Sequence, residues 1–133
     1  MLGQREAQEQ GLRRLIAPYL PRPGQRPFWL FGLDVTPAPR PFAQTLSDRT
    51  FVHQSNPVKG GLPVTIGHPY SAVVALPERD RLTDPPWVVP LSMRRVTSQE
   101  TATEAGAKQV EGLLEDEKMP FHAPAYAGGG SRR

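Results

Sequence analysis

Asp34 is the acidic side chain whose surroundings in the sequence most suggest chemistry. It lies at the downstream end of residues 28–36, FWLFGLDVT, the densest apolar run in the chain. A carboxylate at the end of a buried strand is costly to desolvate without a partner, and a metal ion is one such partner. Thr36 shares its face and would support it. The alternative is an aspartate that accepts hydrogen bonds from amides of the proline-rich turn, and spacing alone favours that alternative.

Two histidines extend this metal hypothesis. Asp34, His53 and His68 would form one ligand set, although the histidines are 15 residues apart in loop-like sequence and lack the i, i+4 spacing of a helical zinc motif. The alternative is that each histidine is a hydrogen-bonding loop side chain. No G-x-S-x-G motif and no phosphate-loop spacing of glycines is present, so neither a serine hydrolase nor a nucleotide-binding loop is indicated.

Arg94 and Arg95 form a basic pair that would suit a phosphate. They precede a predicted helix that opens at residue 97, and the N-terminus of a helix is electropositive. The alternative is a pair of solvent-facing side chains in a strand–helix loop. Spacing does not separate these two interpretations.

Composition limits the classes of protein to which the chain can belong. It has 133 residues, of which 16 are proline and none is cysteine. Proline at this frequency excludes a long coiled coil or a helical-repeat array, and the lack of cysteine excludes a disulfide framework. No run of about 18 apolar residues offers a membrane span. We therefore expect a soluble, cytoplasmic protein that does not contact a membrane.

Periodicity and proline positions divide the chain into short elements. Residues 5–17 are predicted to be a helix with Leu12, Leu15 and Ile16 on its apolar face. The remaining elements are a linker at 18–27, strands at 28–36, 70–76 and 87–92, and short β-prone patches at 50–53 and 64–66.

The first strand, 28–36, has apolar residues at both odd and even positions, and therefore on both faces. This predicts a strand in the middle of a covered sheet. The prolines at 37, 39 and 41 predict that it ends by Thr36. Pro90 inside the third strand predicts an edge strand or a bulge.

Residues 97–117 carry the clearest helical pattern. Thr97 and Glu100 have the spacing of a capping box, and Glu104 and Lys108 have that of an i, i+4 ion pair. The predicted buried stripe is Ala102, Gly106, Val110, Leu113 and Leu114. The elements together predict a small α/β layer with one helix packed on a three-stranded sheet.

Several segments in this order resemble a known family. They are FWLFGLDVTPAPRP, DRTFVHQSNPVKGGLPVTIGHPYSAVVALPE, PWVVPLSMRRV and SQETATEAGAKQVEGLL. The combination resembles the DDE-type transposases of bacterial insertion sequences, at the start of their RNase H-like catalytic domain. The resemblance covers roughly residues 28–117 and implies a partial RNase H-like fold there. From composition we expect a helix and linker at 1–27 and a flexible tail at 118–133.

The resemblance also implies a mechanism and a partner. Such enzymes cut and rejoin DNA with two Mg²⁺ or Mn²⁺ ions held by two aspartates and a glutamate. Asp34 matches the first aspartate of the family. The implied partners are insertion-sequence ends, and a second copy or an intact transposase.

The departure from the family concerns the other two carboxylates. Residues 118–133 contain no aspartate and no glutamate, so the second aspartate and the glutamate of the triad are missing. We therefore expect a truncated transposase that is inactive alone. The alternative is a small non-catalytic DNA-binding protein derived from a transposase, because residues 1–97 carry 12 basic and 7 acidic side chains, a net charge of +5.

Overall fold

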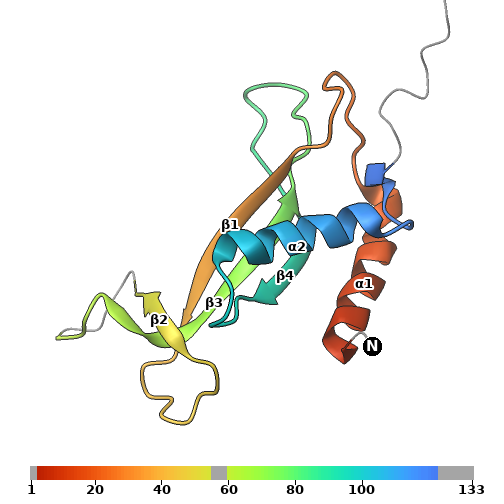
Figure 1. The fold of residues 1–133 in the computed structure, drawn as a ribbon. Coiled ribbons are helices and arrows are strands. Elements are labelled where there is room, and N and C mark those ends of the chain that lie inside the picture. Colours follow the sequence, from red (N-terminus) through yellow and green to blue (C-terminus); the bar gives the residue numbers. More distant parts are fainter. Residues whose placement is uncertain (1–2, 55–59, 123–133) are drawn as a thin grey trace, which may run out of the picture.

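The computed structural model describes residues 3–54 and 60–122, which form a mixed α/β layer (Figure 1). Helix α2 lies across one face of a four-stranded sheet, and helix α1 lies beside strand β4. This arrangement agrees with the predicted partial RNase H-like fold. The elements are α1 (Gln4–Ile16), the 3-10 helix η1 (Ala17–Tyr19), β1 (Phe31–Pro39), β2 (Thr50–His53), β3 (Val64–Ala75), β4 (Val89–Arg95), α2 (Ala102–Glu115) and the 3-10 helix η2 (Pro120–His122).

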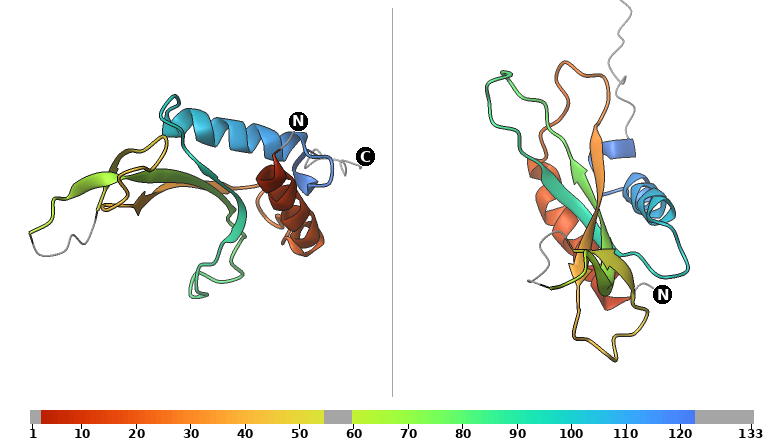
Figure 2. Two further views of the ribbon diagram at one scale, coloured as in Figure 1. Left: turned by 90° about the horizontal axis from the view of Figure 1, so that it is seen from below. Right: turned by 90° about the vertical axis from the view of Figure 1, so that its left-hand side faces the viewer.

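Strand β3 is the centre of the sheet. It pairs along nine residues with β1 on one side. On its other side, its first half pairs with β2 and its second half with β4. All of these pairings are antiparallel. The long β3 therefore extends past the helices toward β2, as Figure 2 shows.

Strand β1 departs from its prediction in two ways. In the described part of the chain it pairs with β3 alone, so it is an edge strand and not the middle of a covered sheet. It also continues to Pro39 and does not end at Thr36. The prolines are tolerated because Pro37 lies opposite Pro69, a position where neither residue needs to donate to the ladder.

Strand β3 also corrects the prediction, because patch 64–66 and strand 70–76 form one continuous element. Gly67 lies inside this element, between β1 and β2. A Cβ at this position would overlap the carbonyl oxygen of Ala38 and would lie 3.0 Å from Cγ2 of Val52. Glycine therefore marks the close approach of three strands and not a turn.

Strand β4 begins two residues later than predicted and runs to Arg95. Pro90 lies opposite Val74 and Ser92 lies opposite Val73, so the intervening Leu91 makes a bulge. The bulge predicted from Pro90 is confirmed. Leu91 is buried in the core.

The hydrophobic core lies between the sheet, α2 and the segments that flank α1 and α2. Trp29 and Phe31 each pack edge-on against Phe121, with ring centroids 4.9 Å apart. Phe121 and the buried Met119 belong to the region predicted as a tail, whose residues 123–133 lie outside the described residues. The buried members of the core are Leu20, Val73, Ala75, Leu91, Leu113, Met119 and Phe121.

Helix α1 forms as predicted but presents a different face. Leu12 and Leu15 are 65% and 70% exposed, whereas Arg13 is buried and Ile16 packs against the core. Glu9 explains part of this orientation, because it pairs with Arg13 at 3.7 Å and accepts a 2.7 Å hydrogen bond from the amide of Met93 in β4. Polar contacts therefore help to dock α1, which an apolar periodicity cannot reveal.

Helix α2 begins at Ala102, five residues after the predicted start. Thr101 caps it, and a capping box joins Thr101 to Glu104. The box predicted at Thr97 and Glu100 is wrong. That pair forms only a turn, in which the Thr97 amide donates to the Glu100 carboxylate at 3.2 Å.

The buried face of α2 differs from the predicted stripe at both ends. It is made of Ala105, Gly106, Gln109 and Leu113, while Ala102 and Leu114 are exposed. Gln109 donates through Nε2 to the Ser71 carbonyl at 2.9 Å and to the Ser92 hydroxyl at 3.0 Å. A buried amide therefore ties the helix to two strands.

Candidate functional site

Asp34 lies in the middle of β1 and is exposed, not at the end of a buried strand as predicted. Its carboxylate accepts a 2.8 Å hydrogen bond from the Val35 amide. Leu33 meets Gly106 of α2, and side chains alternate along a strand, so Asp34 and Thr36 project from the opposite face of the sheet. Asp34 therefore meets solvent on the face that α2 leaves open.

The metal ligand set proposed from Asp34, His53 and His68 is not assembled. Asp34 lies opposite Ala72, whereas His68 lies four residues further along β3, about 13 Å away at strand spacing. His53 is on β2, on the other side of β3. In residues 3–54 and 60–122 no three His, Asp or Glu side chains form a group that could hold a metal ion.

His68 belongs instead to a polar cluster that attaches the loop before β2 to β4. Its Nε2 lies 2.8 Å from the Ser47 carbonyl oxygen and 3.1 Å from Nη1 of Arg95. Arg95 also pairs with Asp48 at 3.4 Å. This supports the interpretation of His68 as a hydrogen-bonding side chain.

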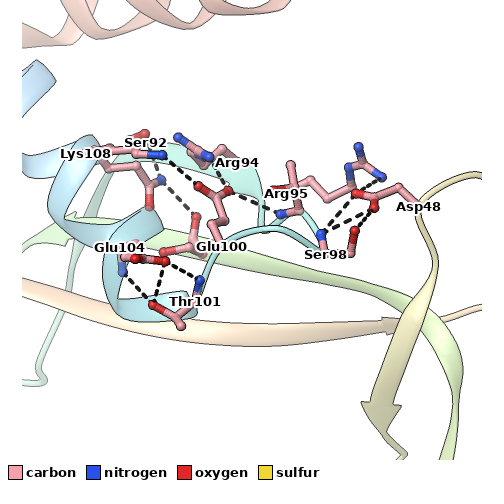
Figure 3. A network of polar contacts seen from close by, with 12 residues as sticks. Asp48, Ser92, Arg94, Arg95, Ser98, Glu100, Thr101, Glu104 and Lys108 are labelled. Atoms are coloured by element: carbon pink, nitrogen blue, oxygen red, sulfur yellow. Dashed lines mark hydrogen bonds and ion pairs between the residues drawn. The ribbon is translucent and has the colours of Figure 1, made fainter.

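Asp48 is the acceptor that organises this cluster (Figure 3). Its carboxylate accepts hydrogen bonds from the hydroxyl and from the amide of Ser98. These hydrogen bonds, helped by the charge of Arg95, lower the pKa of Asp48. The cluster therefore holds a carboxylate that stays ionised beside Arg95.

Arg94 lies beside a second carboxylate, that of Glu100. Glu100 pairs with Arg94 and, at 3.2 Å, with Lys108 (Figure 3). Burial raises the pKa of Glu100, but the hydrogen bonds from the Thr97 amide, Arg94 and Lys108 outweigh it and lower the pKa. Lys108 thus has its ion pair with Glu100, and not with Glu104 as the i, i+4 spacing predicted.

The two arginines are therefore held in place by acids, and each retains 33% exposure of its side chain. A phosphate at this position would share these guanidinium groups with Glu100 and Asp48. The capping box predicted at Thr97 drew attention to Glu100, but not to its ion pair with Arg94. No local pattern pointed to Asp48, whose partners are about fifty residues away.

Glu78 is a further carboxylate that sequence reasoning missed. It accepts hydrogen bonds from the amides of Gln25 at 3.0 Å, Gly24 at 2.8 Å and Arg26, and it pairs with Arg26 Nε at 3.1 Å. Those bonds, Gln25 first, lower its pKa to about 2. Glu78 thus links residues 24–26 of the linker to the chain just after β3. Its position in a polar loop of the sequence did not indicate these hydrogen bonds.

Comparison with known proteins identifies one family. The family model described as DDE superfamily endonuclease matches residues 4–120, which is most of the chain. No curated protein and no solved structure matches it. None of the described helices has the length and apolar character needed to cross a membrane.

Proposed function

Because this chain belongs to the DDE superfamily endonuclease family, we propose that residues 28–117 are part of the catalytic domain of an insertion-sequence transposase. The observation that carries the proposal is the family match together with the position of Asp34, exposed on β1 at the open face of the sheet. In this proposal Asp34 is the first carboxylate of the family's triad. The family activity is DNA cleavage and strand transfer.

The family chemistry requires Mg²⁺ or Mn²⁺ ions, which activate the attacking oxygen and stabilise the leaving one. The residues described here do not fit a two-metal centre. The neighbours of Asp34 on its face of the sheet include Gly32, Thr36 and Ala72, and none of these supplies a second carboxylate. We therefore propose that the 133-residue chain is inactive alone.

A nicking assay on supercoiled DNA tests this proposal. With Mg²⁺ or Mn²⁺ we expect no activity above background from the chain, and the same background from Asp34→Ala. Robust nicking that Asp34→Ala abolishes would overturn the proposed inactivity while supporting the role of Asp34. Robust nicking that Asp34→Ala leaves intact would overturn the role of Asp34.

Contact with DNA is the second part of the proposal. The family acts on DNA, and we propose Arg94 and Arg95 as phosphate contacts, in an active domain or in a non-catalytic DNA-binding derivative. Their support is their partial exposure and the net charge of +5 over residues 1–97.

Salt dependence of DNA binding tests these contacts. The double variant Arg94→Ala, Arg95→Ala should weaken binding and make the log–log salt slope shallower, by roughly one for each lost phosphate contact. The control is Arg5→Ala, which changes an exposed arginine of α1. Equal slopes for the double variant and the unchanged chain would contradict the assignment.

A further inference from the structure

Arg94 and Arg95 lie on opposite faces of the sheet, because side chains alternate along β4. Arg94 lies opposite Ser71 of β3, which is buried and whose hydroxyl faces α2. Residues directly opposite each other in an antiparallel pair project from the same face, so Arg94 projects on the α2 side. Figure 3 shows it there beside Glu100, which also binds Lys108 of α2.

Arg95 lies on the other face, which also carries Asp34. It lies opposite Tyr70 of β3, and Tyr70 lies opposite Thr36 of β1, so these three side chains form a row across the open face. Asp34 belongs to the next row of that face, because it is two residues from Thr36 along β1. Burial along β3 agrees with this division, since residues 71–75 alternate between buried and half-buried, with the odd-numbered ones buried.

The row offers the donors that proteins use to contact phosphate. They are the guanidinium of Arg95 and the hydroxyls of Tyr70 and Thr36. The Cα atoms of Arg95 and Asp34 are about 12 Å apart at standard strand geometry, which one DNA strand spans in roughly three to four nucleotides. A single DNA strand can therefore meet both residues.

The charges of α2 make the other face less suitable for DNA. The helix contains three glutamates and one lysine, a net charge of −2, which repels phosphate. The partner of Arg94, Glu100, is held in a side chain that is only 7% exposed, whereas Asp48, the partner of Arg95, is 27% exposed. Arg95 is therefore the arginine whose ion pair opens more to solvent.

We infer that DNA bound at Asp34 crosses the open face along the row of Thr36, Tyr70 and Arg95, and that Arg94 does not contact it. The inference rests on the proposed function, because it takes Asp34 as the carboxylate that DNA approaches. It narrows the proposed phosphate contacts of the basic pair to Arg95. The two arginines are equally exposed, so the face on which each lies is what separates them.

Salt-dependent binding of a labelled DNA duplex to the single variants tests this division. Arg95→Ala should weaken binding at least about threefold at about 0.1 M salt and make the log–log salt slope shallower by about one. Arg94→Ala is the matched control, because it removes an equally exposed arginine that is also paired with an acid. Its slope should equal that of the unchanged chain.

Removal of the acidic partners separates direct contact from a structural role. Asp48→Asn breaks the ion pair but keeps the guanidinium of Arg95, so direct contact predicts binding that is at least about twofold tighter. Glu100→Gln, which frees Arg94 in the same way, should change binding less. Weaker binding by both Arg95→Ala and Asp48→Asn would show that Arg95 acts only by holding the loop before β2, and would overturn the inference.

Crosslinking identifies the face that DNA covers. The chain has no cysteine, so a single thiol can carry a photoreactive aryl azide. A label on Thr36→Cys should crosslink to DNA, and a label on Thr103→Cys, an exposed position of α2, should not.

Two sets of outcomes distinguish this inference from the proposed function. Equal losses for the two arginine variants, or crosslinking from Thr103→Cys that equals that from Thr36→Cys, would overturn the inference and leave the proposed DNA contact standing. No binding of DNA by the unchanged chain at low salt would overturn the proposed DNA contact, and this inference with it.

Discussion

The carboxylate of Glu78 and the backbone amide of Gln25, 53 residues apart in the sequence, are joined by a 3.0 Å hydrogen bond. This bond and its two neighbours fix the proline-rich segment between α1 and β1 to the end of the central strand. The carboxylate takes the place of a strand or helix partner for a segment whose prolines prevent regular structure.

Acid should weaken the protein through Glu78. Its pKa falls from 4.5 to about 2 in the folded chain, so its contribution to stability is fully present above about pH 4.5 and is lost as the pH falls toward 2. Glu78→Gln should flatten the pH dependence of the unfolding free energy over that window, as measured by urea titrations at successive pH values. Asp80→Asn, which changes an exposed acid of the same loop, is the control, and an unchanged curve for Glu78→Gln would contradict the assignment.

The cap of α2 should depend on Thr101 and not on Thr97. Thr101→Ala removes the side-chain oxygen that accepts from the Glu104 amide and should cost about 1 kcal/mol of the unfolding free energy. Thr97→Ala retains the backbone bond to Glu100 and should cost less than about 0.5 kcal/mol. Chemical denaturation measures the unfolding free energy of both variants. Equal losses for the two would contradict Thr101 as the cap of α2.

Gly67 should not accept a side chain. Gly67→Ala places a methyl group against the carbonyl oxygen of Ala38 and should destabilise the sheet by roughly 1–3 kcal/mol. Gly112→Ala is the matched control, because a Cβ there meets nothing within 4 Å outside its chain neighbours and the backbone of its own helix. Alanine in the helix should stabilise by about 0.5–1 kcal/mol. Thermal unfolding compares the two, and a neutral Gly67→Ala would contradict the close approach.

Gln109 should be coupled to Ser92. Gln109→Met removes the buried amide that bonds to the Ser71 carbonyl and the Ser92 hydroxyl, and it should cost about 1–3 kcal/mol. A double-mutant cycle with Ser92→Ala measures the shared part, for which we expect at least about 0.5 kcal/mol. Strictly additive losses would show that the Gln109–Ser92 bond contributes nothing.

Local patterns predicted the element types well where the partners are close in sequence. The α2 helix follows from its apolar spacing, β2 from the run at 50–53, and the β4 bulge from Pro90. The predictions that were wrong concern partners distant in the sequence. Nothing local to residues 28–36 shows that the strand has a free edge, and nothing local to Gly67 shows that Ala38 lies against it.

The candidate site shows the same division. Asp34 stood out because the residues around it match a family pattern, and the structure puts its carboxylate in solvent on the open face. The acidic partners of Arg94 and Arg95 differ in how far away they lie in the sequence. Glu100 is six residues from Arg94, but Asp48 comes to Arg95 only because β3 brings the loop before β2 and the end of β4 into the same sheet.

The central position of β3 has a consequence for synthesis on the ribosome. β1 is complete at Pro39, but its partner β3 is finished only at Ala75, 36 residues later. At roughly 5–20 residues per second, the apolar strand waits several seconds for a partner, and longer while β3 is still in the exit tunnel. We therefore expect β1 to be the segment of the nascent chain that is most exposed to aggregation before β3 is complete.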